Sequence, residues 1–338
     1  MFEELRAKFD TSDLNAVIDG LPSQLTRAWE FTDVKFSVPV SRVYVFGMGG
    51  SALPADLVKN IVANMNTTTD FEIEVVRDYQ LPRNFSEKSG GIFISFSGNT
   101  EETISSLEEA LNKGFKNLLV MATGGQLLEI ATINHLPYVQ IPNDCLQPRM
   151  GYGYFIGGLL KVLHLSGLLP DLKAELDHTV QTLTAMNEEI QTFAQNLATK
   201  LEKQIPVVYA PDGWKYLAMV VKINFNENTK IQSFWNFFPE LNHNEMIGYS
   251  NLLGNYHLII FDDPGAHPRI RKRLNVFTDL MKDKLPITTI SMLTTGPITK
   301  LFHSLLIGLW TSYFLALKLE TDPTPVAMVE EFKKRLNQ

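Results

Sequence analysis

The feature that most constrains this fold is a repeated alternation of short apolar runs with amphipathic helical patterns. In the first half of the chain, candidate strands lie at residues 42–46, 71–76, 91–96, 117–121 and 138–141. Helical patterns occupy residues 51–65 and 101–113. Parallel strands need crossover connections, which are right-handed and place helices on both faces of the sheet. The sequence therefore predicts an α/β fold built on a parallel sheet.

The alternation starts again in the second half, after two long helical patterns at residues 152–168 and 172–203. The strands expected there are residues 206–210, 257–261 and 287–292, and the helices are residues 214–226, 268–282 and 299–319. Thr324 can cap a last helix and Pro325 can take its first position. We expect an N-terminal helical segment at 1–40, a first subdomain at 41–150, bridging helices at 151–204 and a second subdomain with C-terminal helices at 205–338.

Composition narrows the classes of function. The chain has 338 residues and a net charge of −7, which argues against nucleic acid as its main partner. Its one cysteine, Cys145, cannot form an internal disulfide, and the N-terminus lacks a signal-peptide pattern, so we expect a cytoplasmic protein. Residues 301–317 carry no formal charge but include polar residues such as His303 and Ser304. We expect a buried helix there rather than a membrane span.

A glycine-rich loop, Gly47-Met48-Gly49-Gly50-Ser51-Ala52, follows the first strand and opens a helix that Ser51 is expected to cap. Such a loop can cradle a phosphate on its backbone amides, or it can begin a dinucleotide-binding fingerprint. The fingerprint needs an acidic residue about 20 positions on, whereas Asp78 lies 31 positions after Gly47. A tight turn that needs glycine dihedrals and binds nothing is the third possibility.

A second loop, Ser95-Phe96-Ser97-Gly98-Asn99-Thr100, ends another strand and begins another helix. Ligands of open parallel sheets bind at this edge. Its hydroxyls, together with free amides at the positive end of a helix dipole, suit a compact oxyanion such as a phosphate monoester. The alternative is that Ser, Asn and Thr satisfy their own backbone in a self-capping turn.

Together these two loops resemble those of the sugar isomerase (SIS) domain, and more specifically of the bifunctional phosphoglucose/phosphomannose isomerases of bacteria and archaea. The resemblance continues through Pro148-Arg149, Phe225-Asn226-Glu227-Asn228, Pro239-Glu240-Leu241-Asn242-His243-Asn244 and Asp322-Pro323, and so covers about residue 40 to the end. It implies two flavodoxin-like SIS subdomains, each a parallel sheet covered by helices. It also implies an enzyme that interconverts glucose 6-phosphate, mannose 6-phosphate or both with fructose 6-phosphate.

The resemblance further implies the residues of the site. The phosphate-binding set is Gly49, Gly50, Ser51, Ser95, Ser97 and Thr100. Glu227 is implied as the base, and His243 as the group that opens the sugar ring. Arg149 is implied beside the reacting carbons, and Lys300 is a further match that contacts sugar hydroxyls or relays a proton.

The residue types suit aldose–ketose isomerisation. A partly buried carboxylate such as Glu227 can move a proton between adjacent carbons, and a histidine such as His243 can move one between the ring oxygen and the anomeric hydroxyl. A fixed guanidinium at Arg149 stabilises a negatively charged enediolate. Each residue also has a plain alternative. These are a surface glutamate beside Lys230, an inert loop histidine, an arginine at a domain junction and, for Lys300, a solvated lysine. We rank Glu240 and Glu245, which bracket the histidine, as orienters or surface charge.

The expected reaction moves hydrogen within one substrate, so we expect no metal and no nicotinamide cofactor. Two rival functions remain open: a non-catalytic SIS module that senses a sugar phosphate, and a Rossmann-type oxidoreductase. We expect a homodimer, because related isomerases build the site across two subunits and take the ring-opening histidine from the partner. The aromatic run at residues 234–238 would suit that interface. A core strand is the alternative for this run.

Overall fold

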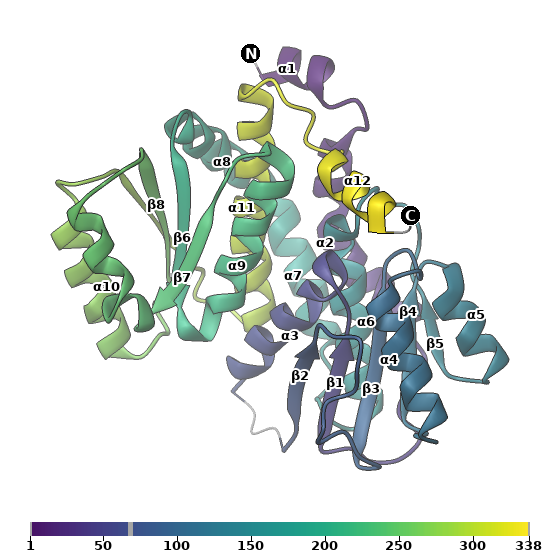
Figure 1. Cartoon of the computed structure of the whole chain (residues 1–338). Coiled ribbons are helices and arrows are strands. Elements are labelled where there is room, and N and C mark those ends of the chain that lie inside the picture. The colour runs from purple at the N-terminus through teal and green to yellow at the C-terminus, as the bar shows by residue number, and fades with distance from the viewer. Residues whose placement is uncertain (1, 67–69, 337–338) are drawn as a thin grey trace. The chain divides into compact units, whose positions relative to one another are not determined.

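The computed structural model describes residues 2–66 and 70–336. The chain divides into two compact units, and Figure 1 labels their helices and strands. The first-sheet unit comprises Gly20–Thr184 and Gly296–Leu301, apart from residues 67–69. The second-sheet unit comprises the described residues within Met1–Asp19, Ala185–Thr295 and Phe302–Gln338. The helical segment after the first sheet is shared between the units, so the domain ranges expected from the sequence stay a prediction.

The first-sheet unit is built on five parallel strands in the order β2-β1-β3-β4-β5. They are β1 (Arg42–Phe46), β2 (Glu72–Val76), β3 (Ser89–Ser95), β4 (Leu118–Ala122) and β5 (Tyr138–Gln140). Alternate residues face opposite sides, so Tyr44 packs in a core with α4 (Glu101–Asn112) and α5 (Gly125–Ile133). Val43 faces α3 (Leu53–Ala63) and α6 (Tyr152–Leu165) on the other side. Both faces are therefore covered, as the sequence predicts.

The second-sheet unit has four parallel strands in the order β7-β6-β8-β9. They are β6 (Ile205–Pro211), β7 (Phe234–Phe238), β8 (Tyr256–Asp262) and β9 (Ile287–Ser291). One face packs on α10 (Pro268–Met281), where Tyr209, Phe238 and Phe277 meet edge to face. Figure 1 shows α9 (Lys215–Asn224) and α11 (Pro297–Lys318) on the other face. The second half of the chain thus repeats the α/β plan.

The remaining helices are α1 (Phe2–Phe9), α2 (Leu14–Phe31), α7 (Lys173–Ala185), α8 (Asn187–Leu201) and α12 (Ala327–Leu336). The apolar pattern at 301–317 lies within α11, and 94% of its most apolar window is buried. This confirms the expectation of a core helix rather than a membrane span.

Several elements differ from the sequence-based expectation, and α5 is not among the helices expected from the sequence. The helix expected at 172–203 breaks at Met186 into α7 and α8. Ser51 does not cap a helix, because it ends a short 3-10 turn (Gly49–Ser51) and α3 begins at Leu53. The run at 234–238 forms β7, a half-exposed strand at the edge of the second sheet.

The last helix begins at Ala327, so Thr324 and Pro325 do not start it. The Thr324 amide instead donates to the Asp322 carboxylate (2.9 Å), which makes a turn of these residues. The helical bonding then starts at the carbonyl of Val326, which accepts from Glu330 N (3.1 Å).

Candidate active site

The two hydroxyl-bearing loops lie side by side at the carboxyl edge of the first sheet. β1 and β3 are adjacent and parallel, with Phe46 opposite Phe93, so the loops that follow them leave the sheet at the same edge. The chain crosses from β1 to β2 on one side and returns to β3 on the other, which makes this the switch point of the sheet. Open α/β sheets bind their ligands at such a point.

Hydrogen bonds tie the two loops together. Ser51 Oγ accepts from the Phe96 amide at 2.9 Å, which links the first loop to the second. Within the second loop, Ser95 Oγ accepts from the Gly98 amide (3.0 Å) and lies 2.8 Å from Thr100 Oγ1. Ser97 Oγ accepts from the Asn99 amide at 3.2 Å. The hydroxyls therefore brace the loops, as the self-capping alternative requires.

These internal bonds still leave proton donors for an anion. A hydroxyl has one proton and two lone pairs. Ser51 and Ser97 act as acceptors in the bonds above, so each keeps its proton, and Ser95 with Thr100 use one of two protons between them. Thr100 also stands at the N-cap of α4 without capping it through its side chain. The first-turn amides of α4 add the positive end of a helix dipole.

Two glycines show how closely the backbone is packed here. Gly98 has a φ of +74°, and a Cβ placed on it would lie 1.7 Å from the Gly124 carbonyl oxygen. A Cβ on Gly50 would lie 2.9 Å from Pro148 Cβ and 3.1 Å from the Arg149 amide. Glycine is therefore required at both positions, and the first loop is pressed against the segment that carries Arg149.

Arg149 lies in a short turn, Pro148–Met150, between the first sheet and α6. It is only 1% exposed, and its backbone lies against Gly50 of the first loop. A buried arginine in this place is not an ordinary surface residue. The structure thus brings the segment of Arg149 together with the first loop.

Lys300 belongs to the same unit, in the first turn of α11, and is 9% exposed. The start of this helix is anchored on α7, because Glu175 Oε1 accepts from the Ile298 amide (3.2 Å) and Thr299 shares a 2.7 Å hydrogen bond with Thr179. Burial raises the pKa of Glu175. The burial of Lys300 excludes the alternative of a solvated lysine at this position.

Glu227 and His243 both belong to the second-sheet unit. Glu227 is half-buried in a single π-helical turn, Phe225–Thr229, that continues α9. Such turns are frequent at functional sites. The turn is fixed by Asn228, which donates to Ser312 Oγ at 2.9 Å, and by Lys230, whose ammonium donates to the Glu227 carbonyl at 2.7 Å.

His243 is exposed and follows the short turn Glu240–Asn242 after β7. Its amide donates to the Glu240 carbonyl at 2.9 Å, and Asn244 donates to the Glu240 carboxylate at 2.6 Å. The site residues expected from the sequence are therefore divided, with the two loops, Arg149 and Lys300 in one unit and Glu227 with His243 in the other.

A third loop supports the second loop and is absent from the sequence-based expectations. Thr123 Oγ1 donates to the Phe96 carbonyl (2.6 Å), and the Gln126 amide donates to Asn99 Oδ1 (3.0 Å). Gly124 lies against Gly98. The signal was present, because Thr123-Gly124-Gly125 follows an apolar run just as the other two loops do.

The second sheet has a corresponding switch point, between β6 and β8. There the cross-link between loops is a carboxylate: Asp263 accepts from Trp214 Nε1 at 2.7 Å and from the Gly265 amide at 2.8 Å. Asp263 is 3% exposed. The second switch point is thus closed by a side chain of the chain itself.

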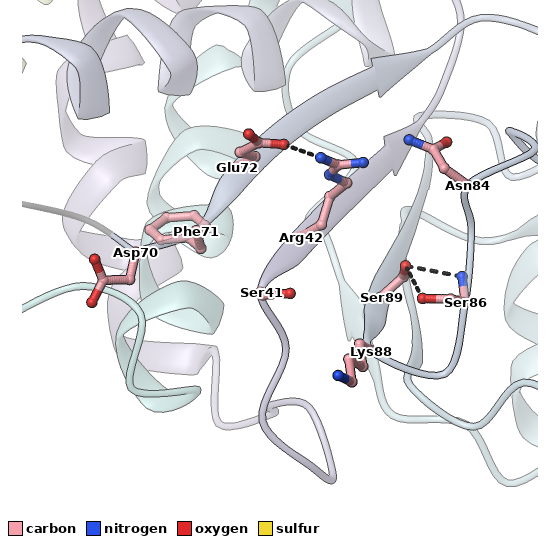
Figure 2. Close-up of a pocket in the computed structure, with 9 residues that line it drawn as sticks. All are labelled: Ser41, Arg42, Asp70, Phe71, Glu72, Asn84, Ser86, Lys88 and Ser89. Atoms are coloured by element: carbon pink, nitrogen blue, oxygen red, sulfur yellow. Dashed lines mark hydrogen bonds and ion pairs between the residues drawn. The ribbon is translucent and has the colours of Figure 1, made fainter.

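A cleft of about 480 Å³ lies at the opposite edge of the first sheet, where the strands begin. Figure 2 shows its lining residues: Ser41, Arg42, Asp70, Phe71, Glu72, Asn84, Ser86, Lys88 and Ser89. Arg42 pairs with Glu72, and Ser89 Oγ accepts from the Ser86 amide (3.1 Å). The cleft mixes both signs of charge and lies away from the helix N-termini, so it does not suit a phosphate.

The one cysteine, Cys145, is a buried free thiol. Burial, with a smaller contribution from Asp144, raises the pKa of Cys145 to about 12, so its thiol stays protonated at neutral pH. Within residues 2–66 and 70–336, no group of three or more His, Cys, Asp or Glu could hold a metal ion.

Known proteins resemble this chain along nearly its whole length. Residues 190–336 match the family described as the bacterial phospho-glucose isomerase C-terminal SIS domain. A bifunctional phosphoglucose/phosphomannose isomerase of Caldicellulosiruptor bescii is 30% identical over 332 residues, which are 94% of this chain and 96% of that protein. One from Aquifex aeolicus is 29% identical, covering 95% of this chain and 98% of that protein.

The fold is also similar to that of solved structures. The C-terminal domain of glucosamine-fructose-6-phosphate aminotransferase from Francisella tularensis has a TM-score of 0.71 and 12% identity. The match covers 92% of this chain and 98% of that domain. At this identity the likeness concerns the fold, and it agrees with two parallel sheets covered by helices.

Proposed function

The chain belongs to the family of bifunctional phosphoglucose/phosphomannose isomerases, and from this premise we propose how its residues divide the work. The protein is an aldose–ketose isomerase that interconverts glucose 6-phosphate, mannose 6-phosphate or both with fructose 6-phosphate. The alternative of a non-catalytic sensing module is not favoured. The reaction passes through a cis-enediol or enediolate. This intermediate forms when the proton leaves C2, and the product forms when the proton is added to C1.

The assignment of the site rests on one observation. The two loops are joined by a hydrogen bond, and the first of them lies against the segment of the buried Arg149. Ser51, Ser97 and Thr100 donate hydroxyl protons to the substrate phosphate, while Gly49 and Gly50 let the backbone approach it. Ser95 is fully buried and holds Thr100 in place. One compact dianion matches this set, because hydrogen bonds to a charged group are the strong ones.

The carbon chemistry belongs to Glu227 and Arg149. Glu227 takes the proton from C2 of the open aldose and returns it to C1, while the second proton moves between the oxygens of C1 and C2. Arg149 stabilises the negative charge that develops on those oxygens. Lys300, which is buried, contacts sugar hydroxyls or relays the oxygen-borne proton.

Ring opening belongs to His243. The closed hexose phosphate must move a proton between the anomeric hydroxyl and the ring oxygen before Glu227 can reach the carbon proton. An imidazole suits this transfer because it can both give and accept a proton near neutral pH. His243 is exposed, which supports a role in which its side chain contacts a molecule outside its own unit.

The chain acts as a homodimer in this proposal, with His243 serving the site of the partner. Apolar side chains are exposed near the loop that carries His243 and on α10, at Ile247 (74%), Leu253 (97%), Val276 (51%) and Leu280 (53%). A groove of about 350 Å³, lined in part by Asn242, Met246 and the last two of these, runs beside the loop. Exposed apolar surface of this kind marks an interaction site. A cytoplasmic location fits a metabolic isomerase whose one cysteine is a buried thiol.

A coupled assay on both aldose phosphates tests the function. The purified protein, treated with a chelator, should form fructose 6-phosphate from glucose 6-phosphate, mannose 6-phosphate or both, without added nicotinamide. Failure to turn over either substrate, under conditions where the protein is folded, would contradict the assignment. Tight binding of a sugar phosphate without turnover would instead support the sensing module.

A further inference from the structure

The loop that carries His243 is tied down at a residue just beyond the histidine. This histidine loop runs from the end of β7 at Phe238 to Glu245, the first residue of the turn Glu245–Ser250. Its first part is held by local bonds, such as that from the Asn242 amide to the Pro239 carbonyl (3.1 Å). Its far end is held by the side chain of Glu245.

Glu245 is bound by side chains from two neighbouring strands. Tyr209 on β6 donates its hydroxyl proton to Oε1, and Asn236 on β7 donates from Nδ2 to Oε2. These two donors are partners in the parallel register of β6 and β7, so their side chains leave the same face of the sheet. Both carboxylate oxygens are therefore engaged by a rigid part of the fold.

The proton order in this cluster follows from counting. An ionised carboxylate only accepts, so the single proton of Tyr209 goes to Glu245. Tyr249, whose hydroxyl bonds that of Tyr209, must then donate to it. Burial raises the pKa of both tyrosines, which keeps both protons in place at neutral pH. The cluster thus runs from Tyr249 through Tyr209 to Glu245.

We infer that Glu245 is a positioning residue, which fixes the His243 loop to the second sheet so that the imidazole meets the sugar ring in one orientation. The inference rests on the ring-opening role proposed for His243. With one end of the loop in β7 and the other at Glu245, few loop conformations remain. If Glu245 no longer holds the loop, the loop gains conformational entropy. This entropy must be lost again each time the imidazole is positioned for the reaction. A misplacement of about 1 Å can cost roughly a hundredfold in rate.

The contacts of Glu245 favour an anchoring role. Hydrogen bonds from the sheet to both oxygens hold this carboxylate in place at the end of the loop. Glu240 offers a contrast within the same loop, because its side chain is exposed and accepts from Asn244 of that loop.

Glu245→Gln is the direct test, because the shape stays while the negative charge that both donors bind is removed. The glutamine NH₂ would face Tyr209 or Asn236, both of which donate to the native carboxylate. Tyr209→Phe removes one of the two hydrogen bonds to residue 245 and keeps the buried ring. Glu240→Gln is the matched control, with the same charge change in the same loop.

The readout is kcat on glucose 6-phosphate in a double-mutant cycle with His243→Ala. We expect Glu245→Gln and Tyr209→Phe to lower kcat about tenfold or more in the native background, with KM nearly unchanged. Neither should lower it further when His243 is already alanine, because the positioned group is gone. Glu240→Gln should keep kcat within about twofold.

The outcomes separate the two claims. If Glu245→Gln lowers kcat equally in both backgrounds, Glu245 acts on the fold or on another step and the inference is wrong. The same conclusion follows if His243→Ala impairs the enzyme while Glu245→Gln and Tyr209→Phe do not. If His243→Ala itself leaves kcat unchanged, the proposed ring-opening role is wrong, and the inference falls with it. Should Glu245→Gln fail to fold by its melting temperature, Tyr209→Phe decides by the same criteria.

Discussion

Among single residues, Ser97 and Thr100 differ from the other hydroxyls because they are not fully buried. Each should contribute a hydrogen bond to a charged group, worth about 1.5–3 kcal/mol. Ser97→Ala and Thr100→Ala should each raise KM about ten- to a hundredfold for glucose 6-phosphate. Ser105 on α4, whose hydroxyl donates to the Tyr79 carbonyl (2.9 Å), provides the control. Ser105→Ala should leave KM unchanged. Unchanged affinity in both loop variants would place the phosphate elsewhere.

Glu227 can be tested with a substitution that keeps its shape. Glu227→Gln removes the base but preserves the π-helical turn, which is held by the neighbouring Asn228 and Lys230. We expect kcat to fall at least ~100-fold with nearly normal substrate binding, the pattern of general-base catalysis. Steady-state kinetics with the coupled assay measure both constants. Full activity in this variant would remove Glu227 from the mechanism.

His243 should matter only for substrates that begin as closed rings. Erythrose 4-phosphate cannot close into a stable six-membered ring, so its isomerisation should depend strongly on Glu227 and weakly on His243. With glucose 6-phosphate, His243→Ala should cost at least ~10-fold in kcat, at the low end of acid–base contributions. Partial misfolding scales both substrates equally and cancels in the ratio. Equal losses on both substrates would instead give His243 a structural role or a part in the carbon chemistry.

Sequence patterns located most of these residues but not their partners. The hydroxyls of the second loop could be predicted to lie at the carboxyl edge of the sheet, because the loop follows a strong strand pattern. That Ser51 accepts from Phe96, a residue 45 positions away, could not, because it depends on the pairing of β1 with β3. Glu245 could not be distinguished from Glu240 for the same reason, since its donors come from two other strands.

At the scale of elements, backbone sterics decide whether the second loop can form. Gly98→Ala would place a methyl group 1.7 Å from the Gly124 carbonyl oxygen at a φ of +74°. The loop must move, so we expect KM to rise at least tenfold and the melting temperature to fall. Gly114→Ala is the control, since its φ of +80° is equally strained but nothing lies within 4 Å. It should cost only about 1–2 kcal/mol of stability, with KM unchanged.

A Gly98→Ala enzyme with the KM of the native protein would show that the second loop does not hold the phosphate. Thermal unfolding of both variants, followed by circular dichroism, separates the strain that they share from the clash that only Gly98→Ala introduces.

Elements with a strong period could be predicted, and those set by tertiary context could not. β1, β3 and β4 were expected within two residues of their observed bounds, because a buried strand reads as a continuous apolar run. The break at Met186 carries no glycine or proline, so nothing local marked it. The run at residues 234–238 predicts either an interface or a core strand, and the structure shows β7, an edge strand with Phe234 47% exposed.

For the whole molecule, the expected state is a dimer that depends on the surface around the histidine loop. Leu253→Asp and Leu280→Asp should each weaken association, because a buried unpaired charge is strongly unfavourable. Light scattering at assay concentration should then report the mass of a monomer, with turnover of glucose 6-phosphate reduced as in His243→Ala. Ile133→Asp on α5, where the residue is 75% exposed, should remain dimeric. A native protein that is monomeric and fully active would refute the shared site.

Because Asp263 closes the switch point of the second sheet, the two switch points differ in how ligand concentration affects stability. Asp263 is covalently attached, so the second switch point carries its anion at all substrate concentrations. In our proposal the first switch point takes its anion, the substrate phosphate, from solution, and binding there stabilises the first-sheet unit by RT ln(1 + [L]/Kd). The two switch points therefore differ, because one is filled by the chain alone and the other is filled according to the level of sugar phosphate.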